Sequence, residues 1–174
     1  MIIISGFQSG VDRAAADAAE ATGLKCYGYV PKGRLAEDGR IPDKYDCMEL
    51  ASPDYSNRTR RNVSQSHAVL IVRPNLGFKS RGTDLTQAAA TNGVMPMLNF
   101  SLDVWEHQDW IGHSRGGVSS SEFVVKWLEA LNIAFVEYTE VKLCVAGPRE
   151  SKCPGIYART LPLLKQIFSM VKRV

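Results

Sequence analysis

The stretch ISGFQSGVDR, residues 4–13, constrains the fold most strongly, because it joins an apolar segment to a polar one through two glycines. Residues 2–4 are all isoleucine, which is typical of a short parallel strand covered on both faces. Gly6 and Gly10 permit backbone conformations that a Cβ disfavours, so a tight turn into a helix is expected. The first amides of that helix would face the space beyond the strand, where the helix dipole favours an anion.

Ser9 and Asp12 offer an alternative for the same turn. Their spacing fits a capping box, in which the serine and the carboxylate satisfy backbone amides at the start of a helix. In that case neither side chain contacts a ligand. Glycine turns between a strand and a helix are common, so these residues alone leave ligand binding and capping equally open.

Length and composition predict one domain, residues 1–174. The chain has 174 residues, of which 45% are hydrophobic, and this is enough for a core. It has no apolar run of about 18 residues and no secretory leader, so we expect a soluble, cytoplasmic protein without membrane contact. The four cysteines match no zinc or redox spacing, which predicts free thiols and no metal site built on sulfur.

Basic residues are concentrated in residues 30–82. This segment holds ten Lys or Arg against six Asp or Glu. A phosphate-bearing small molecule suits such a charge better than nucleic acid, because no nucleic-acid recognition motif and no interleaved aromatic residues accompany it. The alternative is a solvated basic surface with no ligand.

The order of apolar and amphipathic segments predicts an α/β fold of the doubly wound class, with a mostly parallel sheet and helices on both faces. We expect strands at residues 2–4, 25–29, 67–73, 94–99 and 141–146, and helices at 11–22, 54–65, 83–92, 121–131 and 156–173. Pro162 is expected to kink the last helix or to mark its start. Residues 101–119 show no period and predict an irregular excursion, a lid or a subunit contact that involves Trp105 and Trp110.

Three expected strands end in glycine-containing loops, after Ile4, Val72 and Ala146. The carboxyl ends of parallel strands share one edge of the sheet, so the three loops predict a ligand crevice there. Thr83 could instead simply cap its helix. The candidate ligand-binding residues of these loops are Gly6, Phe7, Gln8, Ser9, Gly10, Asp12, Arg13, Arg81, Gly82, Thr83, Thr86, Gly147 and Arg149.

The connection at residues 30–45 is long and has no apolar period, which is typical of a functional loop. Lys32, Gly33 and Arg34 could hold phosphates, while Glu37 and Asp38 could accept hydrogen bonds from ribose hydroxyls. The alternative is that both carboxylates pair with neighbouring arginines within the loop.

The helix at residues 54–65 is expected to begin with Ser52 as cap and Pro53 as first helical residue. Arg58 and Asn62 then share one face and are candidate ligand contacts, unless the arginines of this helix are ordinary surface charges. No catalytic triad is evident, so no catalytic residue is assigned. The histidines show no spacing for a metal site; they are His67, His107 and His113.

Five ordered motifs resemble the putative molybdenum carrier family of the SLOG superfamily, a group of Rossmann-like proteins with nucleotide ligands. The motifs are ISGFQSGVDRAAAD, PKGRLAEDGRIPDKY, DYSNRTRRNVSQS, GTDLT and VAGPRESKCPGIY, and the match runs from residue 2 to about residue 165. The resemblance implies a Rossmann-like fold and a nucleotide-like ligand more firmly than it implies molybdenum. SLOG relatives commonly oligomerise, so a homo-oligomer is expected.

The chain departs from the family pattern in its expected phosphate region. The family usually has two adjacent glycines where this chain has Gly6 and Phe7, and a second glycine pair where it has Arg81 and Gly82. Phe7 would add bulk or a stacking surface, and Arg81 a fixed cation. The preferred ligand is therefore expected to differ from the family's, for example a nucleotide with exposed phosphates.

Taken together, these features predict a binding module, meaning a carrier, sensor or sequestering protein, for a nucleotide-derived, phosphate-bearing ligand such as an ADP-ribose-like signal. The alternative is a hydrolase of nucleotide N-glycosidic bonds, in which Asp12 or Glu37 orients water or stabilises a cationic sugar. The PGGxGTxxE signature of the related Lonely Guy phosphoribohydrolases is absent. The molybdenum cofactor is a third possible ligand.

Overall fold

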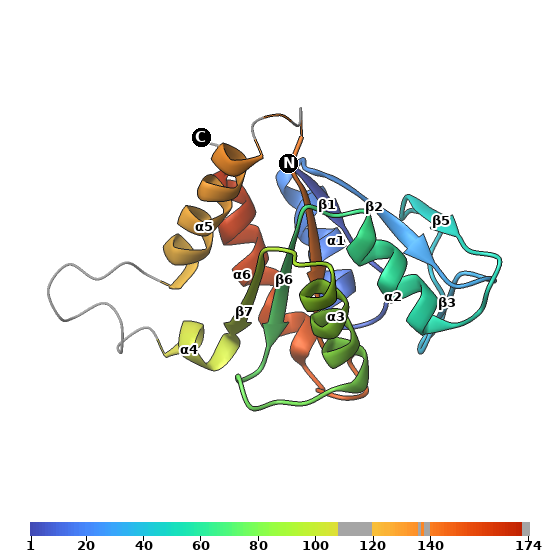
Figure 1. Ribbon diagram of the computed structural model, residues 1–174. Coiled ribbons are helices and arrows are strands. Elements are labelled where there is room, and N and C mark those ends of the chain that lie inside the picture. Colours follow the sequence, from blue (N-terminus) through green and yellow to red (C-terminus); the bar gives the residue numbers. More distant parts are fainter. Residues whose placement is uncertain (108–119, 136, 138–139, 172–174) are drawn as a thin grey trace, which may run out of the picture.

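The computed structural model describes residues 1–107, 120–135, 137 and 140–171. Its main sheet has six strands in the order β5-β2-β1-β8-β6-β7, and all neighbouring strands are parallel (Figure 1). The strands are β1 (Ile2–Ile4), β2 (Lys25–Val30), β5 (Cys47–Glu49), β6 (Ala68–Arg73), β7 (Met97–Ser101) and β8 (Lys142–Ala146). The helices are α1 (Val11–Thr22), α2 (Tyr55–Ser64), α3 (Arg81–Asn92), α4 (Leu102–Glu106), α5 (Ser120–Ala134) and α6 (Ile156–Val171). The predicted α/β, Rossmann-like class is confirmed.

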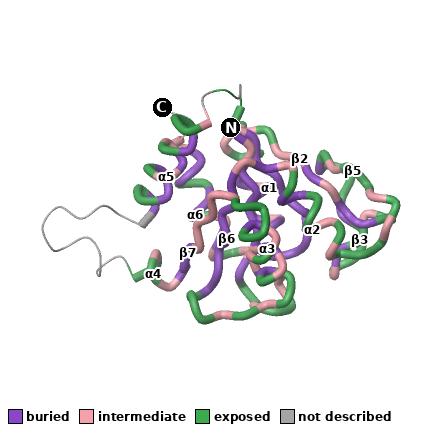
Figure 2. Tube along the Cα trace, viewed as in Figure 1, coloured by how far each residue is buried: buried purple, intermediate pink, exposed green. Residues whose placement is uncertain are grey.

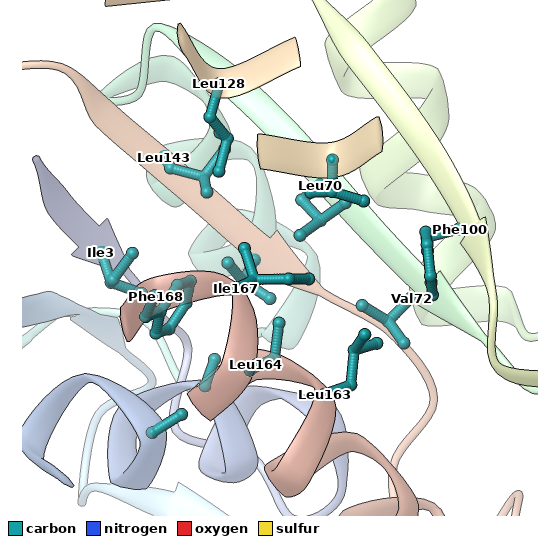
Figure 3. Packing of buried hydrophobic residues seen from close by; sticks show 14 of the residues in the cluster. Ile3, Leu70, Val72, Phe100, Leu128, Leu143, Leu163, Leu164, Ile167 and Phe168 are labelled. Carbon is teal, nitrogen blue, oxygen red and sulfur yellow. The ribbon is translucent and has the colours of Figure 1, made fainter. Parts of the chain in front are cut away.

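Helices cover both faces of the sheet, because alternate residues of each strand point to opposite sides. On one face Ile3, Leu70 and Leu143 belong to a buried cluster with α1, α5 and α6. Figure 3 shows Ile167 and Phe168 of α6 packed in this cluster. On the other face Ile4, Val69 and Cys144 belong to a second cluster with α2 and α3, which contact each other. Each fully buried Leu, Ile or Phe contributes about 1.5–3 kcal/mol of hydrophobic free energy.

The connections reverse direction at the centre of the sheet. β1 leads through α1 to β2 on one side, and β6 leads through α3 to β7 on the other, with β8 between β1 and β6. The helices α1 and α3 lie on opposite faces. In open α/β sheets a crevice forms outside the carboxyl ends of the strands at such a switch point. The predicted convergence of three loops is therefore confirmed for the ends of β1, β6 and β8.

Residues 30–50 form two short elements that the sequence did not predict. A two-stranded antiparallel hairpin consists of β3 (Leu35–Ala36) and β4 (Gly39–Arg40), and β5 adds an edge strand to the main sheet. Figure 2 shows this region as largely exposed in comparison with the central strands. Strands of two or three residues carry too little apolar periodicity to be recognised from sequence.

Several predicted boundaries were wrong. β7 begins at Met97 instead of residue 94, because Val94 adopts a positive φ of 52° and is 90% exposed. The predicted excursion at 101–119 starts as the end of β7 and the short helix α4; residues 108–119, with Trp110 and His113, lie outside the described residues. Trp105, predicted at a subunit contact, packs against the main core cluster.

Pro162 lies inside α6, so it does not mark the start of that helix. All four cysteines are free thiols, as predicted. No helix in the described parts of the chain is long and apolar enough to cross a membrane.

Candidate ligand-binding site

A cavity of about 450 Å³ opens at the switch point, between the N-termini of α2 and α3. Its volume falls within the range of roughly 300–1,000 Å³ that is typical of small-molecule sites. The loops after β1 and β8 close it from the other side. Its lining residues are Gln8, Asp12, Asp54, Tyr55, Ser56, Arg58, Thr59, Ser80, Arg81, Gly82, Leu85, Thr86, Ala146, Gly147, Arg149 and Lys152.

The N-terminus of α3 faces this cavity without a side-chain cap. Ser80 is the N-cap residue in an extended conformation, and its hydroxyl accepts no capping hydrogen bond. Among the described residues, the N–H groups of Arg81, Gly82 and Thr83 meet no acceptor, whereas Asp84 donates to the Ser80 carbonyl. Uncapped first-turn amides and the helix dipole together favour an anion at this point.

Thr83 does not cap this helix, so that prediction was wrong. The helix begins two residues earlier than expected, which moves Thr83 into the first turn. Its side chain is 1% exposed, it does not line the cavity, and its Oγ1 has no hydrogen-bond partner. Thr86, in contrast, lines the cavity, and its hydroxyl donates to the Gly82 carbonyl at 3.2 Å.

The N-terminus of α2 is occupied by its own cap. Asp54, and not Ser52, is the N-cap residue, and its carboxylate accepts a hydrogen bond from the Ser56 amide at 2.8 Å. The Ser56 hydroxyl donates to the other carboxylate oxygen at 2.6 Å. The predicted first helical residue, Pro53, precedes the cap because Tyr55 is the first residue of the helix. The two helix ends at the cavity therefore differ, since one carries a carboxylate and the other is open.

Asp12 and Arg58 form a buried ion pair at the floor of the cavity. Arg58 Nη1 donates to Asp12 Oδ2 at 3.0 Å, and the two side chains are 11% and 7% exposed respectively. Burial raises the pKa of Asp12, while the charge and hydrogen bond of Arg58 oppose this shift. Arg58 Nε is buried without a partner. A Cβ on Gly6 would overlap the Arg58 guanidinium, so glycine leaves the space that the pair occupies.

The backbone amides of the first loop are largely taken by the protein itself. Val11 donates to the Pro148 carbonyl at 3.2 Å, and Arg13 donates to the Gln8 carbonyl at 3.1 Å. The prediction that the first turn of α1 presents its amides to a ligand was wrong for these residues. The capping box was also wrong: Gly10 is the N-cap residue, without a side-chain cap.

In place of backbone amides, the first loop offers the side-chain amide of Gln8 as a hydrogen-bond donor to the cavity. Its Oε1 accepts hydrogen bonds from the amides of Ser9 at 3.0 Å and Glu37 at 2.8 Å. This fixes the orientation of the side-chain amide, and Nε2 donates to no acceptor among the described residues. Gln8 lines the cavity and is only 7% exposed. The two N–H donors of this amide are therefore available to a ligand in the cavity.

Gly10 and Gly147 serve close packing of the loops. A Cβ on Gly10, where φ is +78°, would overlap the Pro148 carbonyl, and a Cβ on Gly147 would overlap the carbonyl of Val72. Gly147 also lines the cavity.

Phe7 does not present its ring to the cavity. It is 1% exposed and packs in a separate cluster beneath the hairpin, with its ring centroid 5.2 Å from that of Tyr45. Its φ is +54°, in the left-handed region that glycine adopts readily. A glycine would adopt this conformation without strain, whereas here the burial of the ring offsets the strain.

Glu37 and Asp38 tie the hairpin to the rest of the protein. Glu37 accepts hydrogen bonds from Ser9 Oγ and from the Ser151 amide and hydroxyl, and its carboxylate lies 3.2 Å from Arg149 Nε. Asp38 pairs with Arg13 of α1. Burial opposes ionisation of Glu37, but the hydrogen bonds from Ser151 and Ser9 hold its pKa below the usual value. Both carboxylates thus pair with arginines, although these come from outside their own loop.

The other candidates from residues 30–45 lie away from the cavity. Arg34 donates to the carbonyls of Ile41, Pro42 and Tyr45 and so organises its own loop. Lys32 is exposed, and neither it nor Gly33 lines the cavity.

Asn62 of α2, another predicted ligand contact, hydrogen-bonds both the amide and the carbonyl of Tyr29, which joins α2 to β2. It lines only a cavity of about 10 Å³ behind the buried ion pair.

Cations reach the cavity from three elements. Arg58 comes from α2, Arg81 from α3, and Arg149 and Lys152 from the loop after β8. Arg149 pairs with Glu37, while Arg81 and Lys152 form no ion pair within the described residues. Two carboxylates also line the cavity, those of Asp12 and Asp54. The surplus of positive charge and the open end of α3 suit an anionic ligand.

Sequence reasoning missed the residues at the α2 N-terminus and some neighbours. They are Asp54, Tyr55, Ser56, Thr59, Ser80, Leu85, Ala146 and Lys152. The Ser-Pro-Asp stretch before α2 was recognised as a helix start. Its position at the cavity depends on how α2 crosses the sheet, and that crossing has no local signal in the sequence. No cluster of His, Cys, Asp or Glu that could hold a metal occurs among the described residues.

Comparisons with known proteins agree with this fold. The model of the circularly permutated YpsA SLOG family matches residues 3–168. A crystal structure at 1.45 Å of a protein named "putative molybdenum carrier protein", from Syntrophus aciditrophicus SB, has a TM-score of 0.76 and 36% sequence identity. That similarity covers 96% of this chain and 93% of the other. The comparison with curated proteins gave no match. The chain therefore belongs to the circularly permutated YpsA SLOG family, a group of nucleotide-related binding proteins.

Proposed function

We propose that this protein is a carrier, sensor or sequestering module that binds a nucleotide-derived, phosphate-bearing ligand, such as an ADP-ribose-like signal, in the cavity between α2 and α3. The observation that carries this proposal is the uncapped N-terminus of α3, which faces a cavity of about 450 Å³. Unpartnered amides at a helix start are a ready site for a phosphate group. Membership of a family with nucleotide-related ligands supports the same chemistry.

Three further groups support an anionic ligand with more than a phosphate. Arg81 adds a cation at the open helix end, and Lys152 adds another on the opposite loop. The Gln8 amide offers N–H donors on the cavity floor. Charge-assisted hydrogen bonds to phosphate are about twice as strong as neutral ones, so these groups favour a phosphorylated ligand over a neutral analogue.

Isothermal titration calorimetry with ADP-ribose, ADP and ribose 5-phosphate tests the proposal. At least one probe is expected to bind, and Arg81→Gln is expected to weaken its binding about tenfold, since a charged hydrogen bond is worth roughly 1.5–3 kcal/mol. The matched control is Lys165→Gln, an exposed lysine of α6 that does not line the cavity. Flat titrations with all three probes, or equal losses in both variants, refute the proposal.

A molybdenum cofactor remains a second candidate ligand, because the similar crystal structure carries the name of a molybdenum carrier. Its phosphate would meet the same amides of α3. Pterin fluorescence in protein freshly purified from its own organism tests this candidate. Such fluorescence, together with silent titrations of the three nucleotide probes, would favour the cofactor over a nucleotide.

The hydrolase alternative now depends on Asp12 alone. Asp12 lines the cavity, and burial raises its pKa, which is the behaviour of a group that can hold a proton for a leaving base. Glu37 does not line the cavity, and protein donors occupy its oxygens. Release of free base from AMP or ADP-ribose, lost in Asp12→Asn while ligand binding persists, would establish hydrolysis. Binding without base release would exclude the hydrolase and support the binding module.

Two further parts of the proposal concern the setting of the protein. Four free cysteines are compatible with a reducing, cytoplasmic environment. We also propose a homo-oligomer, which sedimentation velocity at several protein concentrations tests. A monomer at every protein concentration would contradict the homo-oligomer and would leave the proposed ligand site unaffected.

A further inference from the structure

The two helix N-termini at the cavity are chemically different, and this difference gives the site a direction. At α3 the first-turn amides are open and Arg81 lies beside them. At α2 the carboxylate of Asp54 occupies the equivalent position and satisfies the Ser56 amide. A phosphate is therefore attracted to the end of α3 and repelled from the end of α2.

Asp54 retains acceptor capacity that its cap does not use. Its two oxygens accept from the amide and the hydroxyl of Ser56, and a carboxylate has about four acceptor positions in all. The Ser56 hydrogen bonds lower the pKa of Asp54, and the charges of Arg60 and Arg81 lower it further. The side chain is thus an ionised acceptor on the cavity wall, suited to hydroxyl donors of a ligand.

Tyr55 stands next to this acceptor and supplies an aromatic surface. It lines the cavity and is 38% exposed, so its ring is accessible to a ligand. Leu85 of α3 lines the same cavity. An aromatic ring and an aliphatic side chain together favour the flat face of a base, because base–aromatic stacking is worth about 1–3 kcal/mol.

We infer that Asp54 and Tyr55 form the nucleoside end of the site, where Asp54 accepts hydrogen bonds from the free 2′,3′-diol of a ribose and Tyr55 stacks on the base. The phosphates of the same ligand lie at the N-terminus of α3, and the Gln8 amide lines the same cavity. This inference rests on the proposed function. The inferred contacts make the site selective for a ribonucleotide. A 2′-deoxy analogue lacks the hydroxyl that donates to Asp54, and a 2′-phosphorylated analogue places negative charge beside the Asp54 carboxylate.

Calorimetry with three probes tests the inference: ADP, 2′-deoxy-ADP and 2′-phospho-ADP. The wild-type protein is expected to bind ADP about tenfold more tightly than either analogue, as the loss of one hydrogen bond to a charged group implies. Asp54→Asn is the diagnostic variant, because asparagine caps a helix as well as aspartate does but carries no charge. In this variant the preference for ADP over both analogues is expected to fall to within about threefold.

Two controls keep the test interpretable. Glu49→Gln removes an exposed carboxylate of β5 that does not line the cavity, and it is expected to leave the preference unchanged. Asp54→Ser provides a second capping residue if Asp54→Asn lowers the unfolding midpoint. Arg81→Gln is expected to weaken all three probes, since Arg81 lies beside the open end of α3 where the phosphates bind.

The outcomes separate the inference from the proposed function. If ADP binds and its preference survives in both Asp54 variants, the inference fails while the proposed function stands. If ADP and both analogues bind the wild-type protein equally, the inference fails in the same way. If none of these probes, ADP-ribose or ribose 5-phosphate binds, both fail together.

Discussion

Asp12 of α1 and Arg58 of α2 stand 46 positions apart in the chain and meet in a 3.0 Å ion pair beneath the candidate ligand cavity. The pair links two helices that lie on opposite faces of the sheet. A buried ion pair is weak evidence for stability, because desolvation of both charges costs several kcal/mol. Its position at the cavity floor, and the orphan Arg58 Nε beside it, connect it more closely with the site than with the core.

Gly6→Ala is expected to lower the free energy of unfolding by about 1–3 kcal/mol. The new Cβ would overlap the Arg58 guanidinium and lie 2.8 Å from Asp12 Oδ2, so the ion pair must separate. Urea denaturation monitored by circular dichroism measures the loss. Gly82→Ala is the control, because a Cβ there meets nothing within 4 Å; alanine should not lower stability there and should raise it by up to about 1 kcal/mol through its helix propensity. Equal stability of both variants would mean that the pair relaxes freely.

Phe7→Gly is expected to be more stable than Phe7→Ala by about 1 kcal/mol, the reverse of the usual order of these residues. Both variants lose the ring from its cluster, so both should be less stable than the wild-type protein, by about 3–5 kcal/mol for alanine. Only glycine relieves the positive φ at this position. The reference is Ala88→Gly on the exposed side of α3, where glycine should cost about 1 kcal/mol. If Phe7→Ala is as stable as Phe7→Gly, or more stable, the backbone at position 7 is not strained.

Glu37→Gln is expected to lower stability by about 1 kcal/mol at pH 7 and to lower it by less at pH 4. The folded pKa of Glu37 is lowered, so its carboxylate stabilises the folded state above the unfolded pKa. That contribution is lost as the pH falls through the lower, folded value. Denaturation midpoints at both pH values measure it. Asp38→Asn, which alters a more exposed carboxylate paired with Arg13, should cost less stability at pH 7 than Glu37→Gln.

Thr83→Val is expected to raise stability by about 0.5–1 kcal/mol, because it removes a buried hydroxyl that has no hydrogen-bond partner. A rise of about 1–3 °C in the melting temperature should accompany it. Thr86→Val is the comparison, since the Thr86 hydroxyl donates to the Gly82 carbonyl and lines the cavity. That variant should not gain stability. A destabilised Thr83→Val would show that its hydroxyl has a partner, such as a buried water.

The alternation of apolar and amphipathic segments determined the fold class, because both periods are local properties of the chain. The helix at 11–22 was predicted to the residue, and Gly23, which ends it, adopts the left-handed conformation that is common at helix ends. Helix starts were less certain. Serine, threonine and aspartate all serve as caps, so Ser52 and Thr83 were chosen where the structure uses Asp54 and Ser80.

The sequence by itself determined that glycine loops, basic residues and strand ends would gather at one edge of a parallel sheet. Only the tertiary structure decided which groups face the cavity there. The Pro148 carbonyl of the loop after β8 accepts from the first amide of α1, Glu37 accepts from Ser151, and the crossing of α2 brings Asp54 and Tyr55 beside α3. The physical reason is that a backbone amide or a carboxylate binds whichever partner lies nearest in space, and the nearest partner comes from a segment far away in the chain.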